Sequence, residues 1–406
     1  MTYQQITNLL AIVNFHVVRL KLRASEVHIW LERDQELYRC ANCGQTTLIG
    51  YDSWEVAVAD LPVWGRQTIL HFSKHRIRCT CNHELHVERL PWLFVGARVT
   101  MRLAYEVHEW CRHATVFDVA QRYGLEWHSV KEIDRFFLNL KIAQVDRTNL
   151  RKLSIDEIAY QKRHKYLTIV TDLETRRVIW VGKDRRRATL SHFAREIGPE
   201  VCLKIQVVAI DMWRPYHNAI QRWFPNAQLV YDKFHVIKHL NEALDQVRRQ
   251  EARRLEQAGR KLLKNQRWLL LKGQEKLTPQ QQNDLKVLCE QNVNLASAYI
   301  LKEELREIYR RRKERSQRRQ EFVADTERWI EGWLKRALES GLAPLKRFAR
   351  MIQRWYRGVI AYFEEMVTTS LSEGIANKLR TVMKRAYGYR DLTYQILKIY
   401  QAGGLI

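Results

Sequence analysis

Short apolar runs between residues 152 and 231 restrict the possible folds more than any other part of the sequence. Three β-like runs come first and are joined by links of turn length: Lys152–Ile158, Tyr166–Leu173 and Arg176–Gly182. A helical stretch, a fourth run, a second helical stretch and a fifth run follow at 188–197, 205–210, 215–224 and 228–231. The order predicts a three-stranded meander followed by alternating helices and strands.

This β-β-β-α-β-α-β order is that of the RNase H-like fold, in which the first strand lies beside the fourth. Asp156 stands inside the first run, where a charge is costly unless it has a ligand or partner, and Asp211 directly follows the fourth. If these strands are parallel neighbours, both carboxylates emerge at one end of the sheet and could share hard divalent cations, which suits phosphoryl transfer. For either aspartate alone, helix capping or a salt bridge is the alternative.

A third carboxylate has to come from a later helix, and spacing alone does not choose it. The candidates are Glu303, Glu304, Glu331, Glu364, Glu365 and Glu373. The surrounding sequence favours Glu373, because Asn377, Lys378, Arg380 and Lys384 continue along one helix after it. Phosphate-binding groups would then flank the metal.

Four of the seven cysteines fall in two close pairs at the ends of a segment with β-like runs, Cys40/Cys43 and Cys79/Cys81. The first spacing, followed by a glycine, is typical of two thiolates on one turn of a tetrahedral zinc site. The second pair has a single intervening residue, so His83 and His86 are alternative ligands. Free cysteines that merely pack or lie exposed are the other interpretation. We expect one structural zinc ion in residues 1–95.

The sequence turns helical from Arg98 to Lys141, and residues 114–133 resemble a helix-turn-helix. Val116, Val119 and Ala120 give the first apolar face, Gly124 the turn, Leu125 a core plug, and Val130, Ile133 and Phe137 the second apolar face. The opposite side would present to a major groove the residues Trp127, His128, Ser129, Lys131 and Glu132. An ordinary helical hairpin is the alternative.

The chain carries 69 Lys and Arg against 45 Asp and Glu, a net charge of +24 on a sequence too apolar to be disordered. A polyanion is therefore the expected partner. From about 236 to 365 the sequence is almost wholly helical, with a helix start at Thr278-Pro279, and residues 241–360 hold half of the excess charge. The densest basic block is 309–319. Apolar residues at helical spacing in 345–366 leave a basic face that is either solvated or a track for the DNA backbone.

No apolar run approaches membrane-spanning length, and the N-terminus lacks the pattern of a signal peptide. We therefore expect a protein of the reducing cytoplasm without a membrane partner.

Taken together, these motifs resemble the ISL-three family of insertion-sequence transposases over nearly the whole chain. The most specific parts are the stretches 232–248 and 386–390. The resemblance implies a DDE transposase whose acidic triad is Asp156, Asp211 and Glu373, with two Mg²⁺ or Mn²⁺ ions and one structural Zn²⁺ held by Cys40, Cys43, Cys79 and Cys81. It also implies DNA contacts in the block 373–390, at Lys378, Arg380, Lys384, Arg385 and Arg390.

The expected architecture is a multidomain α+β protein. It comprises a zinc-binding N-terminal module (1–95), a helix-turn-helix (96–145), an RNase H-like α/β catalytic core (150–240), a large all-helical insertion (241–365) and a C-terminal helical part of the core that carries the glutamate (366–406). The insertion would grip phosphates without reading bases, which the N-terminal modules would read.

The resemblance implies that double-stranded DNA, as terminal inverted repeats and as target, is the partner, in the nucleoid of a bacterium. Water would first free a 3′-OH, which would then attack target DNA without a covalent protein–DNA intermediate. Joining two ends implies a dimer or larger assembly. Two alternatives remain: a non-catalytic regulator derived from a transposase, and an RNase H-like nuclease acting on RNA–DNA hybrids, which would not explain the N-terminal modules.

Two features depart from the family or lack a role. The family's second cysteine pair is more widely spaced than Cys79 and Cys81, which leaves ligation by Cys79 in doubt. Asp232 and His235 match the family motif, and could orient a substrate phosphate or a metal ligand or simply cap the helix after the fifth strand; capping is slightly favoured.

Overall fold

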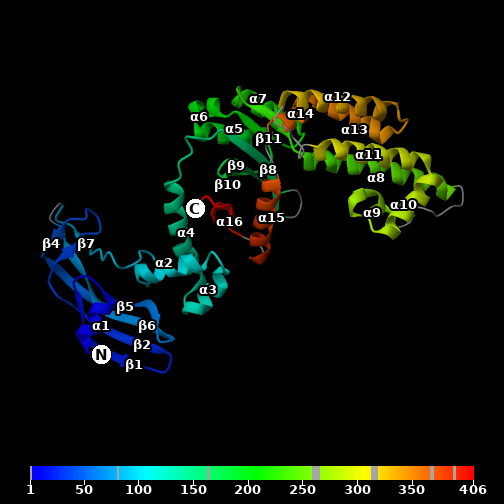
Figure 1. Cartoon of the computed structure of the whole chain (residues 1–406). Helices are drawn as coiled ribbons and strands as arrows, with labels where there is room; N and C mark the ends of the chain where they lie inside the picture. Colours follow the sequence, from blue (N-terminus) through cyan, green and yellow to red (C-terminus); the bar gives the residue numbers. More distant parts are fainter. Residues whose placement is uncertain are drawn as a thin grey trace. The chain divides into compact units, whose positions relative to one another are not determined.

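The computed structural model (Figure 1) describes residues 2–79, 82–161, 165–257, 266–311, 319–365, 370–386 and 390–406, and only the backbone of residues 319 and 370–373. The chain divides into two compact units. Unit 1 comprises Met1–Val145 with Arg385–Ala402 and Ile406, and unit 2 comprises Asp146–Lys384 with Gly403–Leu405. The boundaries expected at 95, 145, 240 and 365 stay predictions.

Unit 1 begins with a helix and a five-stranded sheet. The sheet has the order β1-β2-β6-β5, with β7 also paired to β6, and its strands are β1 (Phe15–Leu22), β2 (Glu26–Arg33), β5 (Gly50–Val63), β6 (Arg66–Arg78) and β7 (Leu85–Val87). A separate hairpin joins β3 (Tyr38–Arg39) to β4 (Thr46–Thr47). The helix, α1 (Tyr3–Leu10), was not expected; Thr2 and Gln5 close its first turn as a capping box.

Three helices follow the sheet of unit 1: α2 (Met101–Trp110), α3 (Val116–Tyr123) and α4 (Trp127–Ala143). The expected turn between the last two is present, because Gly124 adopts φ +64° and ends α3. A side chain at this position would also collide with Gln67 of β6, whose amide nitrogen lies 2.1 Å from the site of a Cβ. Val119, Ala120, Val130 and Ile133 are buried, as the apolar pattern predicts.

The last helix, α16 (Leu392–Ala402), packs on α4 in unit 1, whereas the sequence grouped residues 366–406 as one part of the catalytic core. A buried polar network holds it there. Asp134 of α4 receives a 2.7 Å contact from His108 Nδ1, the hydroxyl of Tyr394 at 2.5 Å and Lys398 Nζ at 3.1 Å. Burying any of these polar groups without its partners would cost free energy. The network therefore stabilises the arrangement in which α16 is docked on α4.

Unit 2 contains the mixed sheet that the sequence predicts. Its order is β10-β9-β8-β11-β12, with strands β8 (Lys152–Gln161), β9 (Lys165–Asp172), β10 (Arg177–Lys183), β11 (Val207–Ile210) and β12 (Gln228–Tyr231). The first three strands are antiparallel neighbours, and β11 lies parallel between β8 and β12. The first strand of the unit therefore lies beside the fourth.

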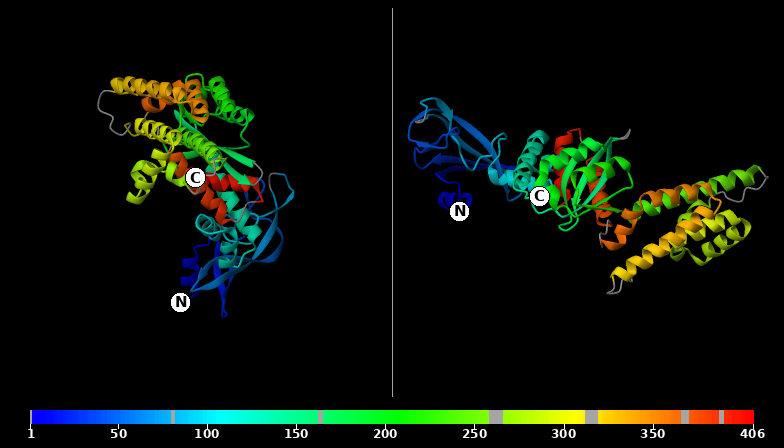
Figure 2. Two further views of the ribbon diagram at one scale, coloured as in Figure 1. Left: turned by 90° about the vertical axis from the view of Figure 1, so that its right-hand side faces the viewer. Right: turned by 90° about the horizontal axis from the view of Figure 1, so that it is seen from above.

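The helices associated with this sheet are α5 (Arg187–Ile197), α7 (Arg214–Trp223) and a short helix that the sequence did not reveal, α6 (Pro199–Lys204). The long helical region comprises α8 (Lys233–Gln257), α9 (Arg267–Leu271), η1 (Gln274–Lys276), α10 (Pro279–Gln291), α11 (Val293–Arg311), α12 (Arg319–Glu339), α13 (Ala343–Arg354) and α14 (Tyr356–Glu364). Within it α8, α11, α12 and α13 pack as a bundle (Figure 2). Thr278 caps α10 with proline at its first position, as expected.

The single amphipathic helix expected over 345–366 is divided in two. Trp355 separates α13 from α14, and α14 turns onto the sheet, where a Cβ at Gly358 would lie 2.4 Å from the Tyr231 ring. The apolar residues from Leu345 to Tyr362 are nevertheless buried or packed against the core. Met366 and most of the basic block 309–319 lie outside the described residues.

No helix in the part of the chain that the structure describes is both long and apolar enough to span a membrane.

Candidate catalytic and DNA-binding sites

Asp156 and Asp211 lie at equivalent positions on two neighbouring strands. β11 pairs with β8 in parallel, and the last matched pair is Ala209 with Ser154. Two residues further along both strands, the same register sets Asp211 beside Asp156. The sequence predicted that both carboxylates emerge at one end of the sheet; Asp211 directly follows β11, and Asp156 lies level with it inside β8, which continues to Gln161.

A third aspartate continues this row. Ile210 of β11 is matched with Tyr231 of β12, so the next pair is Asp211 and Asp232. Asp232 is buried, accepts a 3.0 Å hydrogen bond from the Phe234 N–H, and its carbonyl accepts one from the Val236 N–H. Asp232 therefore caps α8 and at the same time brings a further carboxylate near Asp156.

Two histidines of α8 approach Asp211. His235 Nδ1 lies 3.3 Å from Asp211 Oδ2, and His239 Nε2 lies 3.9 Å from Asp211 Oδ1. Burial alone would raise the pKa of Asp211 and lower the pKa of His235. The ion pair between them outweighs burial, so the pKa of Asp211 lies below its usual value and the pKa of His235 lies above its own. The sequence pointed to His235 without a derived role and missed His239; their spacing of one helical turn was the available signal.

Asp156 and Glu157 lie in a crowded, partly buried set of acidic groups. Burial raises the pKa of Asp156, and Asp232 adds to this, while the Glu157 N–H, His235 and Arg380 oppose it. Burial, Asp156 and Asp211 raise the pKa of Glu157 to about 7. Their oxygen donors are of the kind that divalent cations bind, although no three of these acidic groups among the described residues lie close enough together to share an ion.

Glu157 is held on the side of α7. Its carboxyl group hydrogen-bonds Tyr216, whose hydroxyl lies 2.8 Å from Thr168 Oγ1, and Arg185 acts on it electrostatically. Tyr216, Thr168 and Arg185 did not stand out in the sequence, because each belongs to a different strand, helix or loop and only the fold brings them to Glu157.

Five of the six glutamates considered as a third ligand have other partners. Glu303 pairs with Lys302, Glu304 with Arg336, Glu331 with Tyr356, Glu364 with Gln228 and Glu365 with Lys152. Lys152 begins β8, four residues before Asp156. The sixth, Glu373, lies in α15 (Ser370–Arg385), and its side chain is outside the described part of the structure.

The basic residues of the α15 region differ in their surroundings. Lys378, Arg380 and Lys384 are exposed, and Arg380 bonds Asn377 at 2.8 Å while its charge acts on Asp156. Arg385 instead donates to the carbonyl oxygens of His113, at 2.7 Å, and Arg112. Arg390 is exposed.

Three of the four predicted zinc ligands lie together in unit 1. The sulfur atoms of Cys40, Cys43 and Cys79 all lie within 4.8 Å of one another, and the last two are 3.3 Å apart. For Zn–S bonds of about 2.3 Å, tetrahedral geometry places sulfurs roughly 3.8 Å apart. The three thiols, including that of Cys79, therefore have the spacing that a zinc ion needs.

The two cysteine turns have the same backbone hydrogen bonds. Cys40 N–H donates to the Gln45 oxygen and Gly44 N–H to the Cys40 oxygen; Cys79 N–H donates to the Glu84 oxygen and His83 N–H to the Cys79 oxygen. Gly44 and His83 both have positive φ, 74° and 59°. The two turns therefore present their first cysteines in the same way.

No fourth ligand joins the three cysteines among the described residues. Cys81 itself lies outside them, and neither His83 nor His86 joins the three cysteines in the described part of the chain. His86 Nε2 lies instead 3.2 Å from Asn82 Nδ2.

The first turn of α4 presents the aromatic residues that the sequence assigned to DNA. Trp127 and His128 are exposed and their rings are in contact, with centroids 3.5 Å apart, and Ser129 is half-buried. Lys131 differs from the expectation of a free cation, because its Nζ lies 2.7 Å from Asp391 Oδ2 just before α16. Its position on α4 faces the docked last helix, which the sequence could not show.

Comparison with known families decides among the possible classes of protein. The model of the ISL3 family, described as a transposase, matches residues 153–399. The chain belongs to the ISL-three family of transposases. A second model, the zinc finger of the transposases of IS204, IS1001, IS1096 and IS1165, matches residues 36–81 and so covers both cysteine pairs.

Full-length relatives agree with this assignment. The chain is 34% identical over 92% of its length to the transposase for insertion sequence element IS1001 of Bordetella parapertussis, of which it covers 91%. It is 27% identical over 88% of its length to the transposase for insertion sequence element IS1557 of Mycobacterium tuberculosis, of which it covers 84%. The two family models together cover the cysteine pairs and nearly all of the mixed sheet, so this family member is a transposition enzyme with a zinc-ribbon module, which implies that the protein binds DNA.

Proposed function

We propose that the protein is a DDE transposase with an RNase H-like core, which binds the terminal inverted repeats of its insertion sequence and cuts and rejoins DNA strands at Asp156, Asp211 and Glu373. The observation that carries the proposal is the parallel register of β11 against β8, by which Asp211, directly after β11, falls level with Asp156 in the middle of β8. Hard divalent cations prefer such oxygen ligands.

The position of Glu373 supports its place in the triad. Residue 373 lies two helical turns before Arg380 in α15, so both positions fall on one face of the helix. Arg380 is close enough to act on the charge of Asp156. The other five candidate glutamates each have a basic or hydrogen-bonding partner among the described residues.

The chain's own residues would prepare this site for DNA. Mg²⁺ or Mn²⁺ held by the triad would activate the attacking oxygen and stabilise the leaving oxygen. His235 and His239 hold the Asp211 carboxylate from the α8 side, and the amide of Met212 donates to it at 2.6 Å. Lys378, Arg380 and Lys384 would hold the flanking phosphates.

The N-terminal unit would recognise the ends of the element. We assign α3 and α4 as a helix-turn-helix whose Trp127, His128 and Ser129 face the major groove. Cys81 would complete the zinc site begun by the three clustered cysteines, and the zinc would fix the two turns that carry them. Joining two ends requires at least two copies of the protein.

Strand cleavage by matched variants tests the triad. Asp156→Asn, Asp211→Asn and Glu373→Gln should each abolish Mg²⁺-dependent cleavage of a plasmid carrying the element's ends while leaving binding to those ends unchanged. Glu365→Gln, which removes a glutamate paired with Lys152 away from the site, is the control and should cut normally. Cleavage by an Asp211→Asn enzyme would refute the triad, and a wild type that binds without cutting would indicate a regulator.

A further inference from the structure

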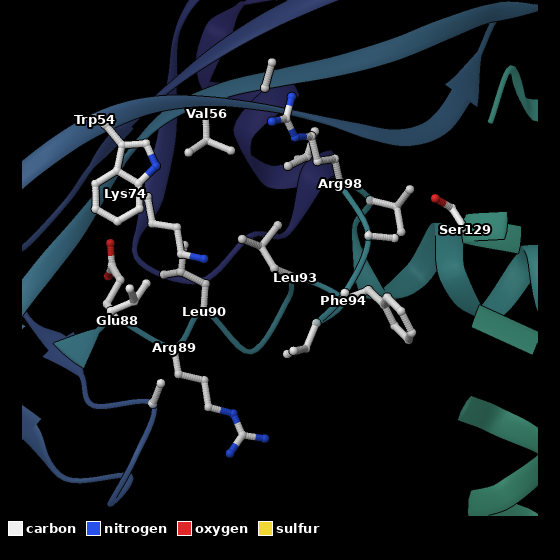
Figure 3. A pocket seen from close by; sticks show the side chains of 18 of the residues that line it. Trp54, Val56, Lys74, Glu88, Arg89, Leu90, Leu93, Phe94, Arg98 and Ser129 are labelled. Carbon is white, nitrogen blue, oxygen red and sulfur yellow. The ribbon is translucent and has the colours of Figure 1, made fainter. Parts of the chain in front are cut away.

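A groove in unit 1 has no role in the function described so far. It has a volume of about 1140 Å³ and lies between β5, the segment that follows β7, and the start of α4 (Figure 3). Residues 54–58 of β5 form one wall, along the edge of the sheet that is not paired with β6. Leu90, Leu93 and Phe94 contribute an apolar wall.

Three basic side chains from three separate segments surround this groove. Lys74 comes from β6, Arg89 follows β7 and Arg98 precedes α2 (Figure 3). Arg89 and Arg98 are exposed and Lys74 is half-buried. Among the residues that the structure describes, none of these three side chains has a carboxylate partner. Other basic residues of unit 1, such as Arg33 and Arg102, are paired with Glu88 and Asp60.

Three glutamates line the groove, but an arginine neutralises one of them. Glu88 lines it, but its buried carboxylate is neutralised by Arg33, at 2.7 Å. Glu55 and Glu126 are exposed carboxylates of the lining. The three free cations therefore outnumber the two free anions, and an anionic chain is the occupant that the charges favour.

The groove is continuous with the proposed reading helix. Ser129 of α4 lines it, two residues after Trp127. Gly124 lines it too, and this glycine packs against Gln67 of β6, so sheet and helix pair form one surface within unit 1. A duplex whose major groove received the start of α4 would run its backbone past this opening.

We propose that this groove binds the sugar–phosphate backbone of the DNA that α4 reads, with Lys74, Arg89 and Arg98 as phosphate contacts. The inference rests on the proposed end recognition and adds a second, sequence-independent contact to it. Phosphate contacts position a protein on the duplex and base contacts specify the sequence. Trp54, 41% exposed at the other end of the groove, would pack against the sugars.

Salt dependence of binding by the full-length protein tests the groove. Two fluorescent duplexes of about 30 base pairs, roughly three helical turns, serve as probes: one carrying the element's end and one scrambled. Each lost phosphate contact lowers the slope of log K against log salt by about 0.9. The triple variant Lys74→Gln, Arg89→Gln, Arg98→Gln should therefore lose two to three units of slope on both probes. Its loss of affinity between 50 and 200 mM salt should shrink roughly 40-fold.

Matched variants separate the site from bulk charge. Arg19→Gln, Lys21→Gln, Arg23→Gln removes the same charge from β1 and the residue after it, at the other edge of the sheet, and should keep the wild-type slope. Lys74→Arg, Arg89→Lys, Arg98→Lys should also keep it, whereas Glu55→Gln should strengthen binding. Unchanged zinc content verifies that each variant is folded.

The possible outcomes distinguish this inference from the proposed function. A groove variant with the wild-type slope overturns the inference, as does an equal effect of the β1 control. A groove variant that alters self-association without DNA, with the slope unchanged, would mean that the open edge of β5 binds a second copy instead. If the wild type does not prefer the element's end over the scrambled duplex, the proposed end recognition itself fails. Trp127→Ala, His128→Ala should abolish that preference while retaining the slope supplied by the groove.

Discussion

His235 holds Asp211 from the neighbouring helix, with Nδ1 3.3 Å from Oδ2 of the carboxylate. The residue that ends the fourth strand is thus oriented by the first turn of α8. Its ion pair keeps Asp211 ionised despite burial, which is the state a metal ligand needs.

Replacing His235 should weaken metal use more than it weakens the fold. Removal of an outer-shell partner commonly costs about 10- to 100-fold in metal affinity or activity. His235→Asn should therefore raise the Mg²⁺ concentration needed for half-maximal cleavage by about that factor, with DNA binding unchanged. His239→Asn is the matched comparison, because His239 lies 3.9 Å from Asp211 and also pairs with Glu242. An equal effect of both variants would contradict a specific role for His235.

Asp232 should behave as a helix cap rather than as a ligand. Its carboxylate accepts the Phe234 amide, and asparagine caps a helix about as well as aspartate. Asp232→Asn should retain end cleavage, whereas Asp232→Ala should lower the free energy of unfolding by about 1 kcal/mol. Cleavage assays and urea unfolding measure the two effects. An Asp232→Asn variant as inactive as Asp211→Asn would place Asp232 among the metal ligands.

Local patterns of the sequence predicted the parts of the fold that depend on neighbouring residues. The runs around Asp156 and Asp211 show strand periodicity, and the known strand order then brings the aspartates together. Gly124 marked the turn between α3 and α4, and Pro279 the start of α10. In each case a few adjacent residues determine the backbone.

Tertiary contacts account for what the sequence did not reveal. Asp134, His108 and Lys398 gave no signal, because their burial depends on α16 folding back onto α4 across more than 260 residues. The sequence alone suggests that Lys131 is a free cation, because its partner Asp391 is distant in the sequence and comes close only in the folded chain. Glu157, Tyr216 and Arg185 likewise meet only once the sheet and α7 are assembled.

Removal of zinc should loosen the N-terminal module. Ligand binding to the folded state contributes directly to folding, so chelation should lower the melting temperature of unit 1 and release one zinc ion per chain. Cys43→Ser and Cys81→Ser should each reduce bound zinc, measured by atomic absorption. Cys289→Ser, in α10, and His86→Gln should not. Full zinc content in the Cys81→Ser protein, with loss of zinc in the His86→Gln protein, would show that His86 and not Cys81 is the fourth ligand.

Asp391 should stabilise the docked last helix in a pH-dependent manner. It accepts the Tyr394 amide at the start of α16 and pairs with Lys131 and Arg135 of α4. These contacts lower its pKa to about 2. The unfolded value is about 3.9, so the contribution is complete above that pH and is lost as the pH falls towards 2.

Unfolding of matched variants tests this contribution. Because Asp391 is partly exposed, Asp391→Asn should cost about 1–2 kcal/mol at pH 7 and progressively less below pH 4. Asp325→Asn removes an exposed pair with Arg328 within α12 and should cost less than about 0.5 kcal/mol at either pH. Denaturant unfolding at pH 7 and pH 3 compares the two. A cost of Asp391→Asn that is as large at pH 3 as at pH 7 would show that the charge of Asp391 does not dock α16.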